Sequence, residues 1–317
     1  MIALVQPRSI DFAGIDVRTA LKEGMARLRA ADLPSHTLAA ELLLMHSLGR
    51  DRAWLYTHSD DSLDSLVAER YFALIARRLA GEPTQYITGK QEFWGLEFEV
   101  TPAVLIPRPE TEHVIEVALE RLGESGIRIN MKTGEPSPTL RVVDVGTVSG
   151  CLAVALAHEL PHAEIFATDI SAAALAVARR NAARHGFADR IHFIQTNLLD
   201  GLLPSSTSTG QSPTDFDLIV SNPPYVARDE ASSLQREVRE HEPEAALFGG
   251  PSGAELYGRL IEQAAVLLAP RGILVLELGY NSADAVRKML QAQRRWANVS
   301  ITNDLAGIPR VIAAERV

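Results

Sequence analysis

The spacing of apolar residues divides the chain into a helical part and a longer part in which strands and helices alternate. Up to about residue 85, apolar side chains recur every three to four positions, as in Val17, Leu21 and Leu28, which predicts amphipathic helices. No strand-like alternation interrupts this pattern. We therefore predict a small helical domain over residues 1–85.

The following segment has the two-residue period of a β-hairpin. Apolar side chains alternate with polar ones around Phe93, Phe98 and Val100, and glycines stand at the expected turns. We predict a hairpin linker over residues 86–112, followed by a second domain over residues 113–317.

In the second domain, short apolar runs alternate with amphipathic helices. The runs lie at residues 140–145, 164–169, 191–194, 216–221 and 272–278. Alternation of this kind is typical of βαβ units and of a parallel sheet covered on both faces. Two closing runs, 299–301 and 310–314, are too near each other for a crossover helix, and they predict an antiparallel pair at the sheet edge. The expected fold class is α/β, with a Rossmann-like, mostly parallel sheet.

Composition and charge narrow the classes of function. Of the 317 residues, 46% are hydrophobic, which excludes general disorder. The net charge of -9 argues against a broad electrostatic grip on nucleic acid. The single Cys151 excludes an internal disulfide framework and fits a reducing compartment. With no signal-peptide pattern at the start and no apolar run of 18 residues, we expect a cytoplasmic protein that does not enter a membrane.

Ligands of parallel sheets bind beside the carboxyl ends of the strands. The first strand of the second domain leads into Gly146-Thr147-Val148-Ser149-Gly150, where glycine allows a sharp turn and a close approach to a ligand. The loop matches neither G-x-G-x-x-G nor the Walker A sequence, which disfavours phosphate binding. A plain strand-to-helix turn remains the alternative.

The next two strand ends also carry candidate residues. Asp169 ends the second strand, where a carboxylate can accept the hydroxyl protons of a ribose. Its competing role is the N-cap of the helix that starts at Ala172. Asn197 and Leu198 follow the third strand, where the edge and face of an adenine would lie in such a site.

The fourth strand ends in Asn222-Pro223-Pro224-Tyr225. Two consecutive prolines fix φ and remove two N–H donors, so that carbonyl oxygens there stay free to accept hydrogen bonds. Asn222 adds an amide and Tyr225 an aromatic face. This combination, directly after a buried strand, is hard to explain as a turn, and it predicts a grip on a planar polar group.

Together these motifs resemble those of S-adenosylmethionine-dependent methyltransferases that act on amide or exocyclic amino nitrogens. Further matching segments are Gln85-Tyr86-Ile87-Thr88-Gly89, Phe93-Trp94-Gly95-Leu96, Pro107-Arg108-Pro109-Glu110-Thr111-Glu112 and Asp304-Leu305-Ala306-Gly307. Over essentially the whole chain, the sequence resembles the HemK/PrmC family of peptide chain release factor N5-glutamine methyltransferases.

The resemblance implies a reaction and a cofactor. The methyl of S-adenosyl-L-methionine would pass to the side-chain nitrogen of the glutamine in the Gly-Gly-Gln loop of class 1 release factors, leaving S-adenosyl-L-homocysteine. The loop from Gly146 to Gly150 would line the methionine part, Asp169 would hold the ribose, and Asn197 and Leu198 would border the adenine.

The resemblance also assigns the substrate side. Asn222, which borders the cofactor too, and the Pro223 carbonyl would hold the substrate amide, Pro224 would complete the catalytic turn, and Tyr225 would pack against the amide plane. The helical domain would bind the protein partner. We expect a monomer that has no nucleic-acid partner.

Two positions depart from the family pattern, and one motif suggests a different chemistry. The middle glycine of the cofactor loop is replaced by Val148, whose β-branched side chain tolerates positive φ badly, so that either the loop shifts or cofactor affinity falls. Asn197 stands where an acidic residue is common, and it can still accept a hydrogen bond. His158-Glu159-Leu160-Pro161-His162 matches H-E-x-x-H, but its proline breaks the helix that a zinc site requires, so we expect no metal.

Two other functions remain open. A DNA or RNA amino-methyltransferase can use the same grip on a flipped base, although the net charge and the lack of a basic recognition domain disfavour it. A release-factor-binding protein whose cofactor binding is impaired by Val148 is the second alternative.

Overall fold

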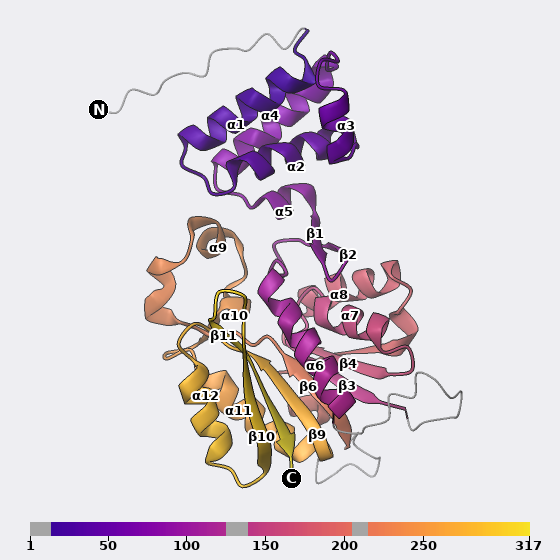
Figure 1. The fold of residues 1–317 in the computed structure, drawn as a ribbon, viewed down its shortest axis with the longest axis vertical. Helices are drawn as coiled ribbons and strands as arrows, with labels where there is room; N and C mark the ends of the chain where they lie inside the picture. The colour runs from indigo at the N-terminus through magenta and orange to yellow at the C-terminus, as the bar shows by residue number, and fades with distance from the viewer. Residues whose placement is uncertain (1–13, 125–138, 205–214) are drawn as a thin grey trace. The chain divides into compact units, whose positions relative to one another are not determined.

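The structure is a computed structural model that describes residues 14–124, 139–204 and 215–317 (Figure 1). The start of the chain, on which the signal-peptide expectation rests, lies outside the described residues. The chain divides into two compact units, Met1–Gly89 and Lys90–Val317.

The first unit is helical, as predicted. Its helices are α1 (Val17–Ala30), α2 (His36–Leu48), α3 (Arg52–Thr57), α4 (Ser65–Leu79) and α5 (Thr84–Thr88). The Asp16 side chain caps α1 by accepting a hydrogen bond from the backbone N–H of Thr19. Leu28, Leu43 and Tyr71 are fully buried in the core that these helices share. Because α5 packs against α2, this unit extends to Gly89 and passes the predicted boundary at residue 85.

The predicted hairpin is present and shorter than expected. It consists of β1 (Lys90–Phe93) and β2 (Leu96–Glu99), which pair antiparallel. Phe93 and Phe98 pack edge to face, 6.1 Å between ring centroids, within the core of the second unit. The segment 86–112 is therefore divided: residues 86–88 end α5, and the hairpin belongs to the second unit.

Seven strands form the central sheet, in the order β10-β11-β9-β6-β3-β4-β5. Their bounds are β3 (Arg141–Val145), β4 (Glu164–Asp169), β5 (Ile191–Gln195), β6 (Phe216–Ser221), β9 (Leu268–Glu277), β10 (Trp296–Asn303) and β11 (Pro309–Arg316). The first five run parallel, whereas β11 pairs antiparallel with β9 and with β10. This confirms the mostly parallel sheet with an antiparallel edge. A small parallel pair joins β7 (Val226–Ala227) to β8 (Phe248–Gly250).

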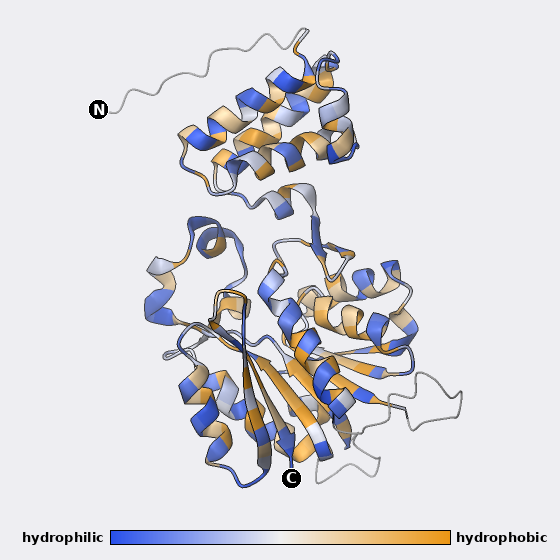
Figure 2. Cartoon of the chain, in the orientation of Figure 1, coloured by the Kyte–Doolittle hydropathy of each residue, from blue (hydrophilic) through white to orange (hydrophobic). Residues whose placement is uncertain are grey.

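Helices cover both faces of this sheet. The longer ones are α6 (Glu112–Glu124), α7 (Cys151–Glu159), α8 (Ala172–Arg184), α11 (Glu255–Leu267) and α12 (Ala283–Gln291), with the short α9 (Arg236–His241) and α10 (Glu244–Leu247) between strands. Neighbouring residues of β3 point to opposite faces: Val142 packs with α6, α7 and α8, and Val143 packs with α11 and α12. The central strands are consequently mostly apolar (Figure 2), as in a parallel sheet buried on both sides.

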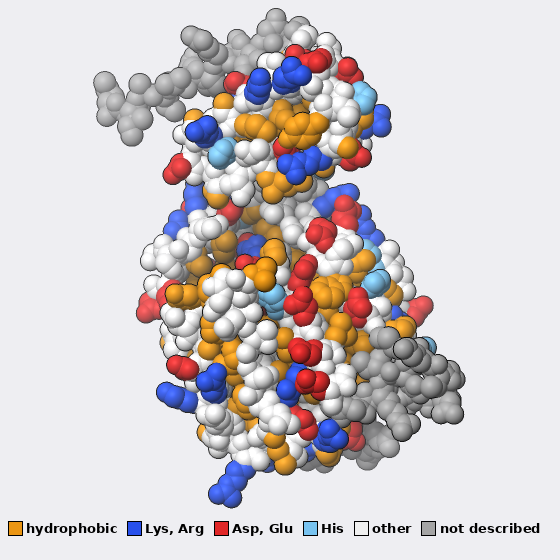
Figure 3. Space-filling model, in the orientation of Figure 1, with side chains coloured by type: hydrophobic (Ala, Val, Ile, Leu, Met, Phe, Trp, Pro, Cys, Tyr) orange, Lys and Arg blue, Asp and Glu red, His pale blue; other side chains and the backbone are white. Residues whose placement is uncertain are grey.

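One surface of the second unit is acidic. The exposed residues Glu116, Glu120 and Glu124 recur every four positions along α6. Acidic side chains gather over this helix on the face shown in Figure 3. Such a face repels nucleic acid phosphates. None of the described helices is long and apolar enough to cross a membrane.

Candidate active site

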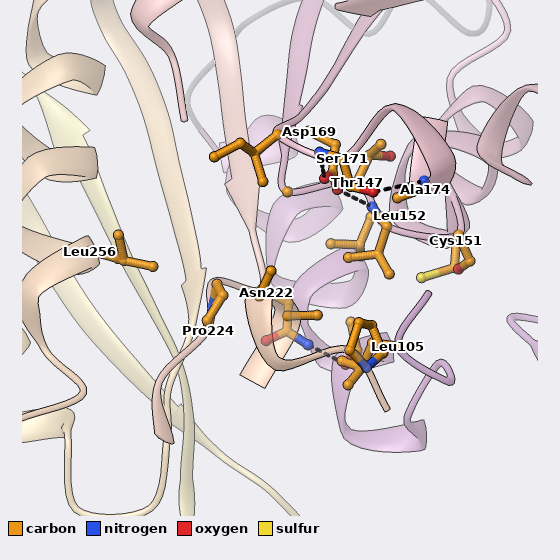
Figure 4. A pocket seen from close by; sticks show the side chains of 18 of the residues that line it. Leu105, Thr147, Cys151, Leu152, Asp169, Ser171, Ala174, Asn222, Pro224 and Leu256 are labelled. Carbon is orange, nitrogen blue, oxygen red and sulfur yellow. Dashed lines mark hydrogen bonds between the residues drawn. The ribbon is translucent and has the colours of Figure 1, made fainter. Parts of the chain in front are cut away.

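A pocket of about 350 Å³ lies at the carboxyl ends of the parallel strands (Figure 4). The loops after β3, β4, β5 and β6 each contribute to its wall. The residues from these loops are Gly146, Thr147, Val148, Ser149, Asp169, Ile170, Ser171, Asn197, Leu198, Asn222 and Pro224. The strand-end rule thus leads to one cavity that contains most of the residues predicted from the sequence.

The loop after β3 repeats a left-handed backbone conformation at every second residue. φ is 69° at Gly146, 53° at Val148 and 82° at Gly150. Strain was expected at Val148, and the structure places this β-branched residue in the left-handed region at the pocket wall. Gly150 does not line the pocket. An added Cβ there would lie 3.0 Å from Ala178 Cβ, so this glycine serves the packing of α7 against α8.

A buried carboxylate supports this loop from below. Asp144 Oδ2 accepts hydrogen bonds from Thr147 Oγ1 at 2.6 Å and from the Ala153 backbone N–H at 3.1 Å. Burial raises the pKa of Asp144 to about 7. No role was predicted for Asp144, although a carboxylate inside an apolar strand indicates a specific hydrogen-bonding role.

Asp169 connects two segments of the pocket wall. Its Oδ2 accepts from the Val148 backbone N–H at 2.9 Å, and its Oδ1 accepts from the Ser171 N–H at 2.8 Å. The N-cap of α8 is Ser171, whose side chain accepts from the Ala174 N–H, so the capping role considered for Asp169 belongs to its neighbour. Burial raises the pKa of Asp169.

The turn after β6 brings part of its motif to the pocket. Asn222 and Pro224 line the wall, whereas Pro223 is buried and Tyr225 lies outside the lining. The Tyr225 hydroxyl is 3.5 Å from Glu277 Oε1 at the end of β9. Burial raises the pKa of Tyr225 far above its ordinary value, so that its hydroxyl stays protonated.

Three glycines that were not predicted as site residues surround this turn. An added Cβ would lie 2.3 Å from the Pro224 carbonyl oxygen at Gly249 and 2.3 Å from the Tyr225 carbonyl oxygen at Gly253. At Gly279 it would lie 2.7 Å from the Tyr225 ring. The glycine-rich run at residues 249–253 was the available signal, but only the fold shows what those glycines touch.

A further part of the wall comes from residues 103–111, for which no site residue was predicted from the sequence. Beyond this segment, the pocket is also lined by Pro243, Ala245, Ala246, Leu256 and Arg259. Ala103, Leu105, Pro107, Arg108 and Thr111 line the pocket. Arg108 forms an ion pair of 2.5 Å with the buried Glu242, which connects this segment to the end of α9. The pKa of Glu242 is raised, because the effect of burial exceeds the opposing effect of the Arg108 guanidinium.

Two other candidate groups receive plain structural explanations. Helix α7 ends at Glu159, so His158 and His162 do not share a helical face. Cys151 lines the pocket, and burial raises the pKa of its thiol to about 12, so it is not a thiolate at neutral pH.

Comparisons with known proteins match this architecture. Residues 19–89 match the PrmC N-terminal domain family, and residues 136–308 match a methyltransferase domain family. A release factor glutamine methyltransferase of Koribacter versatilis is 44% identical over 300 residues, which cover 95% of this chain and 98% of that relative. A Bradyrhizobium diazoefficiens protein of the same name is 41% identical over 98% of this chain and 99% of its own length.

The chain belongs to the release factor glutamine methyltransferase family. The methyltransferase domain of the family occupies the unit that contains the pocket. Among solved structures, the hMettl16 catalytic domain in complex with the MAT2A 3'UTR hairpin 6 is similar, with a TM-score of 0.53 and 18% identity over 76% of this chain and 81% of that chain. At 18% identity, this similarity shows a shared fold and nothing about function.

Proposed function

We propose that this protein transfers the methyl group of S-adenosylmethionine to the side-chain amide nitrogen of the glutamine in the Gly-Gly-Gln loop of class 1 release factors. The observation that carries the proposal is that the Asp169 carboxylate and the Asn222 amide line the same pocket. Relatives at 44% and 41% identity bear the name of this activity and match nearly the whole chain.

The residues of the pocket fit the cofactor. A carboxylate offers about four lone-pair sites, and two backbone N–H groups occupy two of those on Asp169. The remaining sites can accept the two ribose hydroxyls. Apolar Ile170 and Leu198 flank this position and offer surfaces for an adenine, with Asn197 at its edge. When bound, the cofactor supplies an electrophilic methyl carbon on a positively charged sulfur.

The substrate side must overcome the weak nucleophilicity of an amide nitrogen, whose lone pair is delocalised into the carbonyl. The Asn222 Oδ1 and the Pro223 carbonyl would each accept one N–H of the glutamine side chain. Two acceptors orient the nitrogen for in-line attack, and they stabilise the positive charge that develops on it. No ionised base is needed before transfer, because the N–H proton leaves the positively charged N-methyl amide for water after the sulfur–methyl bond has broken. The role of Tyr225 against the amide plane stays a prediction.

The other partners and properties also stay predictions. The first unit, which matches the PrmC N-terminal domain, is proposed as the surface that binds the release factor. The monomeric state, the cytoplasmic location and the absence of a nucleic-acid partner are expected on the sequence arguments given above.

One assay tests the proposal. Purified protein is incubated with labelled S-adenosylmethionine and a class 1 release factor whose Gly-Gly-Gln glutamine is intact or replaced by alanine. We expect label only on the intact factor. Label on DNA or RNA and none on the factor would indicate an amino-methyltransferase of nucleic acid. A protein that binds the factor but neither binds the cofactor nor transfers label would be a binding protein.

A further inference from the structure

A chain of hydrogen bonds runs from Asn222 into the interior of the second unit. Asn222 Nδ2 donates to Thr111 Oγ1 at 3.0 Å, and Thr111 Oγ1 donates to Glu277 Oε2 at 2.6 Å. Thr111 and Glu277 are 3% and 2% exposed. The three residues come from the turn after β6, the short helix η1 (Pro109–Thr111) and the end of β9, so only the folded protein brings them together.

The chemistry of this chain fixes the orientation of the Asn222 amide. A threonine hydroxyl has one proton, and an ionised carboxylate has none. Thr111 therefore gives its proton to Glu277, and its oxygen can only accept from Asn222. The NH2 end of Asn222 must face Thr111, which leaves Oδ1 at the other end of the side chain, where no described residue forms a hydrogen bond with it. Figure 4 shows the nitrogen of Asn222 in its hydrogen bond and the oxygen turned away from it.

We propose that Thr111 and Glu277 are positioning residues, which hold the Asn222 amide with its oxygen toward the substrate so that the site accepts an NH2 group. This inference rests on the proposed function and adds two residues to it. In the reversed orientation, an NH2 group of Asn222 would face the NH2 group of glutamine. Two donors cannot form a hydrogen bond, and the substrate nitrogen would not be held in line.

The same carboxylate also reaches the other end of the turn. Glu277 Oε1 lies 3.5 Å from the Tyr225 hydroxyl, at the outer limit of a hydrogen bond. The backbone carbonyl of Glu277 accepts from the Tyr257 hydroxyl at 2.8 Å. Glu277 is thus held from its main chain, lies near Tyr225 through Oε1, and reaches Asn222 through Oε2 and Thr111.

Protonation of Glu277 would reverse the chain of donors. Burial raises the pKa of this carboxyl to about 7. The charged and titratable groups that interact electrostatically with Glu277 are Arg310, Glu110, Tyr225, Tyr257 and Cys151. Arg310 opposes the rise but is itself paired with Asp304 at 2.8 Å. A protonated Glu277 can donate to Thr111, which is then free to donate to the oxygen of Asn222. The turnover number should therefore fall as the pH drops through about 7.

The central test compares Thr111→Val, which keeps the shape and loses the hydroxyl, with Thr111→Ser, which keeps the hydroxyl. We expect a loss in kcat of about ten- to a hundred-fold for the valine variant and of no more than about threefold for the serine variant. Cofactor dissociation constants, measured by calorimetry, should stay within about twofold of the parent for both, because neither substitution changes the Asp169 side of the pocket. An unchanged kcat in Thr111→Val, or equal losses in both variants, would overturn the inference.

A pH series separates positioning from packing. In the parent, kcat should fall below about pH 7. In Glu277→Gln, whose side chain does not titrate and can still accept from Thr111, kcat should not fall in this pH range. If kcat of Glu277→Gln falls below pH 7 as it does in the parent, Glu277 does not control the Asn222 amide.

A third measurement does not depend on activity. In protein labelled with 15N-asparagine, the side-chain NH2 signal of Asn222 is identified by its absence in Asn222→Asp. We expect this signal to move toward the position of a free amide in Thr111→Val and to stay in place in Thr111→Ser. If the parent fails to methylate release factor, the proposed function fails, whereas an unmoved signal in Thr111→Val refutes the positioning chain by itself.

Discussion

The two walls of the pocket use glycine for opposite reasons. In the loop after β3, Gly146 supplies positive φ, and an added Cβ there would meet nothing within 4 Å. Around the turn after β6, Gly249 and Gly279 have no such φ, but an added Cβ would collide with the turn itself. The first requirement is conformational, and Val148 meets it at a cost of about 1–2 kcal/mol. The second is steric, and no side chain meets it.

We call the loop after β3 together with Asp169, proposed to hold the cofactor, the cofactor wall, and the turn after β6, proposed to hold the substrate amide, the substrate wall. From the difference we expect the cofactor wall to tolerate substitution and the substrate wall not to tolerate it. Asn222 gives the strongest test. Asn222→Ala removes the acceptor for the substrate N–H, and we expect kcat to fall about 10²–10³-fold while the cofactor dissociation constant changes little. Steady-state methylation of release factor and calorimetry with S-adenosylhomocysteine measure the two effects. A large loss of cofactor affinity with kcat preserved would assign Asn222 to the opposite wall.

Gly249→Ala tests the steric requirement without touching the pocket lining. The new Cβ would lie 2.3 Å from the Pro224 carbonyl oxygen, so the turn must move. A displacement of about 1 Å at a reacting group can cost about a hundred-fold in rate, and we expect a loss of kcat of that order.

The matched control for this variant is Gly258→Ala in α11, where an added Cβ meets nothing within 4 Å. It should keep full activity and gain about 0.5–1 kcal/mol of stability, as measured by denaturant unfolding. Equal activities for the two alanine variants would show that the turn does not depend on the close approach of its neighbours.

Asp169→Asn tests the cofactor wall. The amide would place a donor against one of the two backbone N–H groups that the carboxylate accepts, and it would lose charge at the ribose position. We expect the cofactor dissociation constant to rise about tenfold. Asp64→Ala serves as the control, since it removes the cap of α4, does not touch the pocket lining, and should lower stability by about 1 kcal/mol. If Asp169→Asn, like this control, leaves the cofactor dissociation constant unchanged, the role of Asp169 is structural only.

The smallest effect is expected at Val148. Val148→Gly relieves positive φ and removes both methyl groups, and the cofactor dissociation constant should fall by about threefold. Val148→Ala keeps the strained Cβ but removes the methyl groups. Tighter binding in both variants would identify side-chain bulk as the cause, and tighter binding in the glycine variant alone would identify backbone strain. Identical constants for all three proteins would show that Val148 impairs nothing.

Much of the second unit was predictable from local sequence signals. The strands Glu164–Asp169 and Phe216–Ser221 begin and end where their apolar runs do, because polar side chains follow each buried run directly. The strand-end rule then located the pocket. Helix α12 was not predicted, although the four-residue spacing of its buried Val286 and Leu290 is a helical signal in the sequence.

The parts of the site that were missed depend on contacts between distant segments. Thr111 and Glu277 are 166 positions apart, and neither has a local pattern that indicates its partner. In the same way, Gly279 looks like an ordinary residue after a strand until the Tyr225 ring is placed over it. Sequence patterns reveal which residue types a loop contains, whereas the approach of two backbones is a property of the fold.

The wall formed by Ala103 to Thr111 determines where the catalytic half of this chain can be cut. A fragment that begins at residue 113 would retain every strand of the large sheet, yet its cavity would lie open on one side and Asn222 would have no hydroxyl to anchor it. A fragment that begins at Lys90 keeps the hairpin and the closing segment. Protein engineers who wish to transplant this methylation module should therefore take the hairpin with it.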